Sequence, residues 1–180
     1  MEVIKTEIPD VLIFKPKVFP DERGIFMETY NKKIFDEIGI YYDFKQDNIS
    51  VSKKNVVRGL HFQKFPFEQG KLVRVVNGAV LDVAVDIRKD SPTFGQYVKV
   101  VLSIENNFIF WIPSGFAHGF LSLEDDSTLY YKATEFYNKD AEDAIVWNDP
   151  DINIDWGIKG PIVSEKDKNA KSLKDFIQLI

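Results

Sequence analysis

The chain has 180 residues, a formal net charge of −5, no cysteine and two histidines. This length suits one domain with a sizeable core, so we expect residues 1–180 to form a single domain. The lack of cysteine excludes disulfides, Cys-ligated zinc and a thiol nucleophile, and two histidines cannot supply a three-histidine metal site within one chain. The negative charge argues against a nucleic-acid binder but leaves room for a local basic pocket that takes a small anion.

The first ten residues and the length of the apolar runs predict the cellular compartment. Residues 1–10 mix charged and apolar side chains, which is unlike a secretory signal. No apolar run approaches the roughly 18 residues of a membrane span. We therefore expect a cytoplasmic protein without a membrane partner.

The first predicted elements are short strands. Residues 11–18 are apolar and β-branched but contain Pro16, which indicates an edge strand or a strand with a break. A turn at residues 21–24 leads into a second short strand, which we expect over residues 25–30.

A helix and a polar strand follow. Asn31 can cap a helix over residues 31–38, and Gly39 can end it. From residue 46 the pattern has a period of two, so one face of the next strand is polar but nearly uncharged. The side chains of that face are Gln46, Asn48, Ser50 and Ser52.

The remainder of the chain predicts many short strands. Asn77-Gly78 is a strong hairpin signal between strands at residues 71–76 and 79–87. Strands about ten residues apart are typical of sandwiches and barrels, and we predict an all-β, double-sheet jelly roll with short helices near both ends. The other expected elements are strands at 56–63, 97–104, 108–113, 119–123, 128–136 and 144–147 and a helix at 171–179.

The sequence around His61 is the first candidate for chemistry. In a regular strand His61 and Gln63 share a face and Arg58 lies on the other. Gly59 would allow a bulge that brings Arg58 and His61 into one pocket. The alternative is a half-buried histidine beside an exposed arginine.

Three further side chains carry both a functional and a structural interpretation. Lys71 lies in an apolar strand and either points into a pocket or protects a sheet edge. His118, between Ala117 and Gly119, is poorly solvated, which favours its neutral form. Tyr131 and Tyr130 lie on opposite faces of one strand, so one of them points inward.

Six carboxylates could orient a histidine, and spacing does not choose among Asp21, Glu28, Asp82, Asp86, Glu142 and Asp167.

The chain lacks the motifs of several enzyme classes. It contains no G-x-S-x-G, no phosphate-binding glycine-rich loop and no G-x-G-x-x-G. The H-x-H pair of metal-dependent cupins is also absent, and His61 and His118 are far apart in sequence.

Seven segments carry a resemblance to a known family over residues 4–173. They are FPDERGIFMETYN (19–31), QDNISVSKKNVVRGLHFQ (46–63), QGKLVRVVNGAVLDVAVDIRKDSPTFGQ (69–96), WIPSGFAHGFLSL (111–123), YKATEFY (131–137), WNDPDINIDW (147–156) and SEKD (164–167). The chain resembles the dTDP-4-dehydrorhamnose 3,5-epimerase family. Residues 64–68 and the last seven residues are less typical of it.

The resemblance implies a cupin-type jelly roll that acts as a homodimer with exchanged N-terminal strands and needs neither cofactor nor metal. It implies epimerisation of dTDP-4-dehydro-6-deoxy-D-glucose to dTDP-4-dehydro-L-rhamnose. The family's general base corresponds to His61, and the carboxylate that orients this base corresponds to Asp167. The acid corresponds to Tyr131, and the cation near the C4 oxygen corresponds to Lys71. The positions that match substrate-binding residues are Arg23, Glu28, Gln46, Asn48, Arg58, His118, Glu142 and Lys166.

Three alternatives remain beside the double epimerase. A relative that inverts only C3 or C5 in a modified-sugar pathway would keep the same His, Lys and Tyr. A metal-dependent cupin oxygenase or isomerase, and a jelly roll that only binds sugar nucleotides, are more distant possibilities. The motifs do not identify the final glycan, the aromatic residues that stack on the base, or any assembly beyond the dimer.

Overall fold

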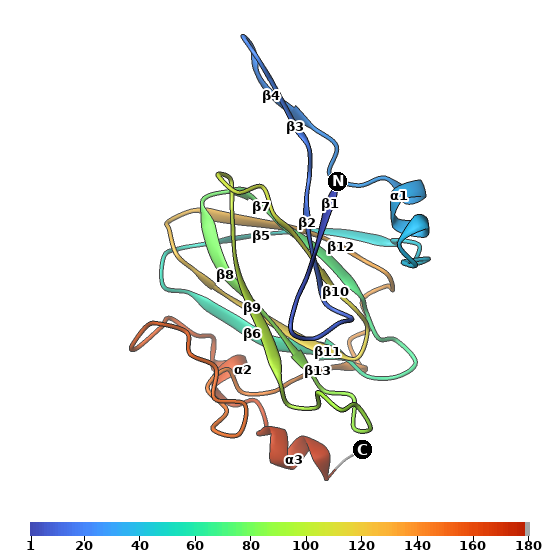
Figure 1. Cartoon of the computed structure of the whole chain (residues 1–180). Helices are drawn as coiled ribbons and strands as arrows, with labels where there is room; N and C mark the ends of the chain where they lie inside the picture. The colour runs from blue at the N-terminus through green and yellow to red at the C-terminus, as the bar shows by residue number, and fades with distance from the viewer. Residues whose placement is uncertain (179–180) are drawn as a thin grey trace.

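The computed structural model describes residues 1–178 of the chain, and strands dominate it. Two antiparallel sheets form a jelly roll, as predicted (Figure 1). The strands of the six-stranded sheet, in spatial order, are β1 (Glu2–Lys5), β2 (Leu12–Lys15), β10 (Ile109–Ile112), β7 (Lys71–Asn77), β12 (Ser127–Ala133) and β5 (Gln46–Ser52). Those of the five-stranded sheet are β13 (Glu142–Ala144), β6 (Val57–Gln63), β11 (Phe116–Ser122), β8 (Ala79–Asp86) and β9 (Tyr97–Ser103).

A separate hairpin of β3 (Val18–Asp21) and β4 (Gly24–Met27) projects from the two sheets (Figure 1). The predicted turn at residues 21–24 closes it, and the backbone N–H of Arg23 donates to Asp21. The break expected at Pro16 separates β2 from β3. The strand expected over residues 25–30 ends at Met27.

The short helices lie near both ends of the chain. Helix α1 (Lys32–Glu37) begins after Asn31, whose side chain accepts a hydrogen bond from the Lys33 N–H, as its sequence predicted. Helix α3 (Leu173–Ile177) lies within the C-terminal helix predicted over residues 171–179, of which the last residue lies outside the described residues. The sequence did not predict α2 (Glu165–Lys168) or β1.

The hairpin predicted at Asn77-Gly78 is wrong. Although β7 and β8 flank this dipeptide, β7 pairs with β10 and β12 in one sheet, and β8 pairs with β9 and β11 in the other. The tight turn therefore carries the chain from sheet to sheet. Both strands bury apolar side chains between the sheets, and this burial outweighs the local preference for pairing across the turn.

Alternation along the strands divides the core into three parts. Between the sheets, Val73 and Leu129 of one sheet pack against Val80 and Ala84 of the other. The outer face of the five-stranded sheet is covered by the C-terminal segment, including Trp156. The outer face of the six-stranded sheet is covered around β2 and β10 by α1. No helix of the described residues is long and apolar enough to cross a membrane.

Candidate active site

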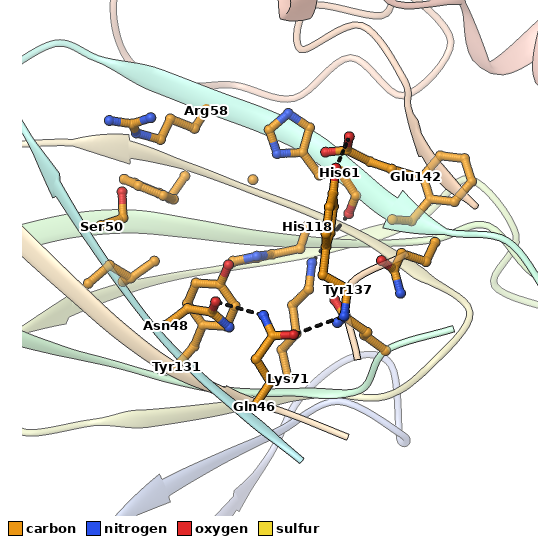
Figure 2. A pocket seen from close by; sticks show the side chains of 16 residues that line it. Gln46, Asn48, Ser50, Arg58, His61, Lys71, His118, Tyr131, Tyr137 and Glu142 are labelled. Carbon is orange, nitrogen blue, oxygen red and sulfur yellow. Dashed lines mark hydrogen bonds between the residues drawn. The ribbon is translucent and has the colours of Figure 1, made fainter. Parts of the chain in front are cut away.

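A cavity of about 470 Å³ opens between the two sheets. Each sheet contributes polar side chains to it, and His61, Lys71 and Tyr131 point into the same space (Figure 2). Its lining consists of Gln46, Asn48, Ser50, Arg58, His61, Phe62, Gln63, Gln69, Lys71, His118, Gly119, Phe120, Leu129, Tyr131, Tyr137 and Glu142.

The predicted bulge at Gly59 brings Arg58 and His61 to one wall. Gly59 has a φ of +134°, and the register between β6 and β11 shifts beside it. A Cβ at this position would lie 2.5 Å from the Cα of Gly119, so the close approach of the two strands requires glycine. Arg58 and His61 therefore share the inner face, as the sequence suggested.

His61 is paired with a buried carboxylate. Its Nε2 lies 2.7 Å from Oδ1 of Asp167, whose second oxygen accepts the Gly59 N–H at 3.3 Å. Asp167 belongs to α2, and the Ser164 side chain that caps this helix accepts its N–H. Burial works to raise the pKa of Asp167, but the hydrogen bond and charge of His61, with the Gly59 N–H, hold this pKa below its ordinary value. Asp167 thus keeps Nε2 occupied and leaves Nδ1 of His61 free for the cavity.

His118 forms a second pair of this kind. It lies directly opposite His61 in the β11–β6 pairing, and its Nε2 is 2.9 Å from Oδ1 of Asp82. Burial lowers the pKa of His118, while Asp82 opposes that shift, so the neutral form is favoured as the sequence predicted. Of the six candidate carboxylates, the structure assigns Asp167 to His61 and Asp82 to His118.

Lys71 is the buried cation of the site. It is 8% exposed, and its Nζ donates to the carbonyl of His61 at 3.5 Å. Burial lowers the pKa of Lys71 to about 8, and the charges of Asp82 and Glu142 oppose this shift. Lys71 therefore points into the cavity and does not protect a sheet edge.

Tyr131 faces the cavity from the six-stranded sheet, whereas His61 belongs to the five-stranded sheet. Its ring centroid lies 6.5 Å from that of His118. Burial raises the pKa of Tyr131, and the nearby Arg58 opposes this rise. The hydroxyl group therefore keeps its proton at neutral pH. The two sheets thus place His61 and Tyr131 on different walls of one cavity.

The polar face of β5 lines the same cavity. Gln46 donates to the side-chain oxygen of Asn48 at 2.8 Å, and the buried amide nitrogen of Asn48 has no partner among residues 1–178. Arg58 donates to the hydroxyl of Ser52 at 3.1 Å. This wall offers hydrogen bonds without negative charge.

Glu142 and Lys166 form an ion pair of 2.7 Å beside the mouth. Burial works to raise the pKa of Glu142, and the hydrogen bonds from Lys166 and Tyr137 outweigh it, so this pKa lies below its ordinary value. Lys166 does not line the cavity, but its partner does.

Two predicted substrate-binding residues lie away from this cavity. Arg23 is at the tip of the projecting hairpin, where it pairs with Asp21 and its side chain is 83% exposed. Glu28 follows the hairpin and accepts a hydrogen bond from the side chain of Asn31. Within one chain, neither residue reaches the other predicted site residues.

Gln69 and Tyr137 were not predicted as site residues. Gln63 was placed on the His61 face without a role, and Asp82 was predicted only as one of six carboxylates that could orient a histidine. Gln63 shares the His61 face by simple alternation, which was a usable signal. Tyr137 lies in a loop after β12, where no periodicity indicates direction. Among the described residues, no group of three or more His, Asp or Glu side chains is arranged to hold a metal ion.

The fold and the cavity together define a cupin-type jelly roll whose cavity holds two histidines, each paired with a carboxylate. The family model for dTDP-4-dehydrorhamnose 3,5-epimerase matches residues 5–175. The chain therefore belongs to the dTDP-4-dehydrorhamnose 3,5-epimerase family, and it is an epimerase of the isomerase class.

Individual relatives agree with this assignment. The chain is 57% identical over 176 residues to a dTDP-4-dehydrorhamnose 3,5-epimerase of Shigella flexneri, and 97% of each chain is covered. The Legionella pneumophila dTDP-6-deoxy-D-glucose-3,5-epimerase in complex with dTDP-4-keto-L-rhamnose is 48% identical, with a TM-score of 0.93 over 96% of this chain and 93% of that one. A 3'-monoepimerase of Streptomyces bikiniensis in complex with dTDP-quinovose is 33% identical, with a TM-score of 0.91 over 97% and 89%.

Proposed function

We propose that this enzyme epimerises dTDP-4-dehydro-6-deoxy-D-glucose at C3 and C5 to dTDP-4-dehydro-L-rhamnose, for dTDP-L-rhamnose synthesis in the cytoplasm. The observation that carries the proposal is the placement of His61 and Tyr131 on different sheets around one cavity. Inversion at carbon needs a base on one face of the sugar ring and an acid on the other. We also propose that residues 1–180 fold as a single domain.

His61 acts as the base. The hydrogens at C3 and C5 are both alpha to the C4 ketone, so one carbonyl activates both centres through an enolate. Asp167 holds the proton of His61 on Nε2, which leaves Nδ1 to accept the substrate proton. The same carboxylate stabilises the imidazolium that forms.

Tyr131 returns a proton from the opposite side. Its raised pKa keeps the hydroxyl protonated until the enolate is present. Deprotonation by His61 and reprotonation by Tyr131 from another wall invert the carbon. These are proton transfers alone, which is why we propose that the reaction needs no cofactor or metal. A chelator should therefore leave turnover unchanged, whereas a metal-dependent cupin would lose activity.

Lys71 stabilises the enolate oxygen. It is the buried ammonium of the cavity, and a preorganised donor of this kind contributes about 3–4 kcal/mol to lowering a barrier. Since Asp82 occupies Nε2 of His118, the neutral His118 ring offers Nδ1 as an acceptor. We therefore assign His118 to substrate binding, and we assign to Lys71 the hydrogen bond donated to the enolate oxygen.

The diphosphate needs a local cluster of cations because the chain has a net charge of −5. Arg58 and Lys166 lie at the cavity wall and mouth, and arginine suits bidentate phosphate contacts. The amides of Gln46 and Asn48 add neutral hydrogen bonds, and Glu142 orients Lys166.

A homodimer completes the site. The projecting hairpin carries Phe19, Ile25 and Phe26, which are 48%, 59% and 71% exposed. A two-stranded hairpin with exposed apolar side chains is unstable by itself and needs a surface to pack on. We propose that it exchanges with a second copy of the chain, so that Arg23 and Glu28 reach the partner's cavity. In the single chain β1 and β2 pair with their own sheet, which leaves this hairpin as the exchanged part.

Complementation tests the exchange. Arg23→Ala and His61→Asn should each be inactive alone, because each removes one half of every site. After joint unfolding and refolding, half of the dimers are mixed and carry one intact site, so about a quarter of wild-type activity should return. Recovery of no activity would contradict an exchanged hairpin.

Turnover in D2O tests the reaction itself. Double epimerisation places a deuteron at both C3 and C5 of the product, whereas a single-centre epimerase places one. The double reaction is favoured because the two 3,5-epimerases compared above are 57% and 48% identical to this chain, whereas the 3'-monoepimerase is 33% identical. A product with one deuteron would replace the proposal by the single-centre reaction. Absence of turnover with retained binding would indicate a sugar-nucleotide binding protein.

A further inference from the structure

A strap of irregular chain, residues 135–138, lies between β12 and β13 at the rim of the cavity. It carries Tyr137, which lines the cavity, is 54% exposed and points toward Glu142 (Figure 2). No sheet ladder includes these residues, so their peptide groups depend on other partners.

Glutamine side chains supply those partners. Gln69 donates to the carbonyl of Glu135 at 2.7 Å, and Gln46 accepts the N–H of Tyr137 at 2.8 Å. The side chain of Gln63 makes more hydrogen bonds than that of Gln69 or Gln46. Its amide nitrogen donates to the carbonyl of Phe136 at 3.1 Å, and its oxygen accepts the N–H of Asn138 at 2.7 Å. Gln63 therefore holds the peptide groups on both sides of Tyr137.

The third contact of Gln63 ties a second loop to the strap. The same amide nitrogen donates to the carbonyl of Phe67 at 2.6 Å. Gln63 is itself 6% exposed and sits on β6, where its backbone pairs with Glu142, the residue that accepts the Tyr137 hydroxyl at 3.1 Å. The paired strands β6 and β13 thus hold Tyr137 through its flanking peptide groups, by Gln63, and through its side chain, by Glu142.

We propose that Gln63 is a positioning residue, which holds Tyr137 at the rim of the cavity so that Tyr137 contacts the bound sugar nucleotide. The inference rests on the function proposed above. His61 is two residues from Gln63 on the same face, yet no hydrogen bond of Gln63 goes to His61, Lys71 or Tyr131. Gln63 should therefore affect substrate binding and leave the proton transfers intact.

Gln63→Met tests this, because it keeps the side-chain length and removes all three hydrogen bonds. We expect KM to rise about tenfold, as for a lost set of buried hydrogen bonds, with kcat changed less than about twofold. Hydrogen–deuterium exchange of the peptide covering residues 135–141 should be faster. Gln63→Glu, which keeps the acceptor for Asn138 but loses both donors, should behave similarly if Gln63→Met does not fold.

A double-mutant cycle with Tyr137→Ala separates positioning from a general structural role. If Gln63 acts through Tyr137, Gln63→Met should change KM by less than about twofold in the Tyr137→Ala background. Additive increases in KM, an unchanged KM in Gln63→Met, or a fall in kcat alone would each overturn the proposal.

The same variants distinguish this proposal from the proposed function. If the wild-type enzyme does not turn over the 4-dehydro sugar, the proposed reaction fails. The cycle is then measured on the Kd for dTDP. A Gln63→Met effect that depends on Tyr137 supports the positioning role, and an effect independent of Tyr137 overturns it.

Discussion

The contact between His61 and Asp167 predicts a large loss of catalytic rate in Asp167→Asn. In the wild type, one carboxylate oxygen lies 2.7 Å from Nε2 of His61 and the other accepts the Gly59 N–H at 3.3 Å. An asparagine has a single oxygen, so its amide group cannot serve both partners. If that oxygen faces Gly59, the NH2 group donates to Nε2 and moves the imidazole proton to Nδ1. The nitrogen that should accept the substrate proton is then occupied.

The loss of charge sets the size of the effect. When His61 takes a proton, it becomes a cation beside the Asp167 carboxylate. Two unit charges about 4 Å apart attract by about 4 kcal/mol at an effective dielectric constant near 20. Since about 1.4 kcal/mol corresponds to a factor of ten in rate, Asp167→Asn should lower kcat by about 10³-fold.

Deuterium incorporation at C3 and C5 and formation of the inverted product measure this rate directly. Asp151→Asn is a matched control, because it removes the same charge from an exposed position. Thermal unfolding of both variants checks that the fold persists. If Asp167→Asn is folded and retains more than about a tenth of wild-type exchange, Asp167 does not orient His61 or stabilise its protonated form.

Four other residues of the site give testable outcomes. His61→Asn should abolish exchange at both carbons, and substantial exchange at C5 would require a second base. Tyr131→Phe should reduce epimerisation more than deuterium exchange, because the base remains; equal losses would remove Tyr131 from the acid role. Burial lowers the pKa of Lys71 to about 8, so kcat should decline above pH 8. The unfolded chain keeps the Lys71 proton to about pH 10, so the stability of the wild type relative to Lys71→Met should rise between pH 8 and pH 10 by about 2 kcal/mol, measured by urea unfolding. Gly59→Ala forces a Cβ to 2.5 Å from Gly119 at a φ of +134°, and we expect a loss of several kcal/mol in the same measurement; an unchanged midpoint would contradict the close approach of the strands.

Short-range features of the chain were readable from the sequence. The alternation from Gln46 to Ser52 predicted a polar strand face, and Gly59 predicted the bulge that turns Arg58 toward His61. The Asn31 cap was equally clear. Each of these depends on backbone periodicity or on one residue's conformational freedom, which neighbouring residues determine.

The carboxylates that pair with the two histidines could not be predicted from local sequence patterns. Asp167 lies 106 residues from His61, and Asp82 lies 36 residues from His118. Several carboxylates were chemically equivalent candidates, and only the packing of α2 against β6 and the pairing of β8 with β11 select two of them. The family resemblance supplied Asp167, while spacing alone supplied neither.

By itself, the sequence of 180 residues with two histidines and no cysteine determined the type of strands, the polar face and the chemistry that the side chains can perform. The tertiary structure decided which strands share a sheet, so that Asn77-Gly78 joins two sheets rather than closing a hairpin. It also placed Arg23 on a projecting hairpin and Gln63 beneath the strap. The physical reason is that side-chain direction follows from local backbone geometry, whereas pairing between distant segments follows from the burial of apolar surface over the whole chain.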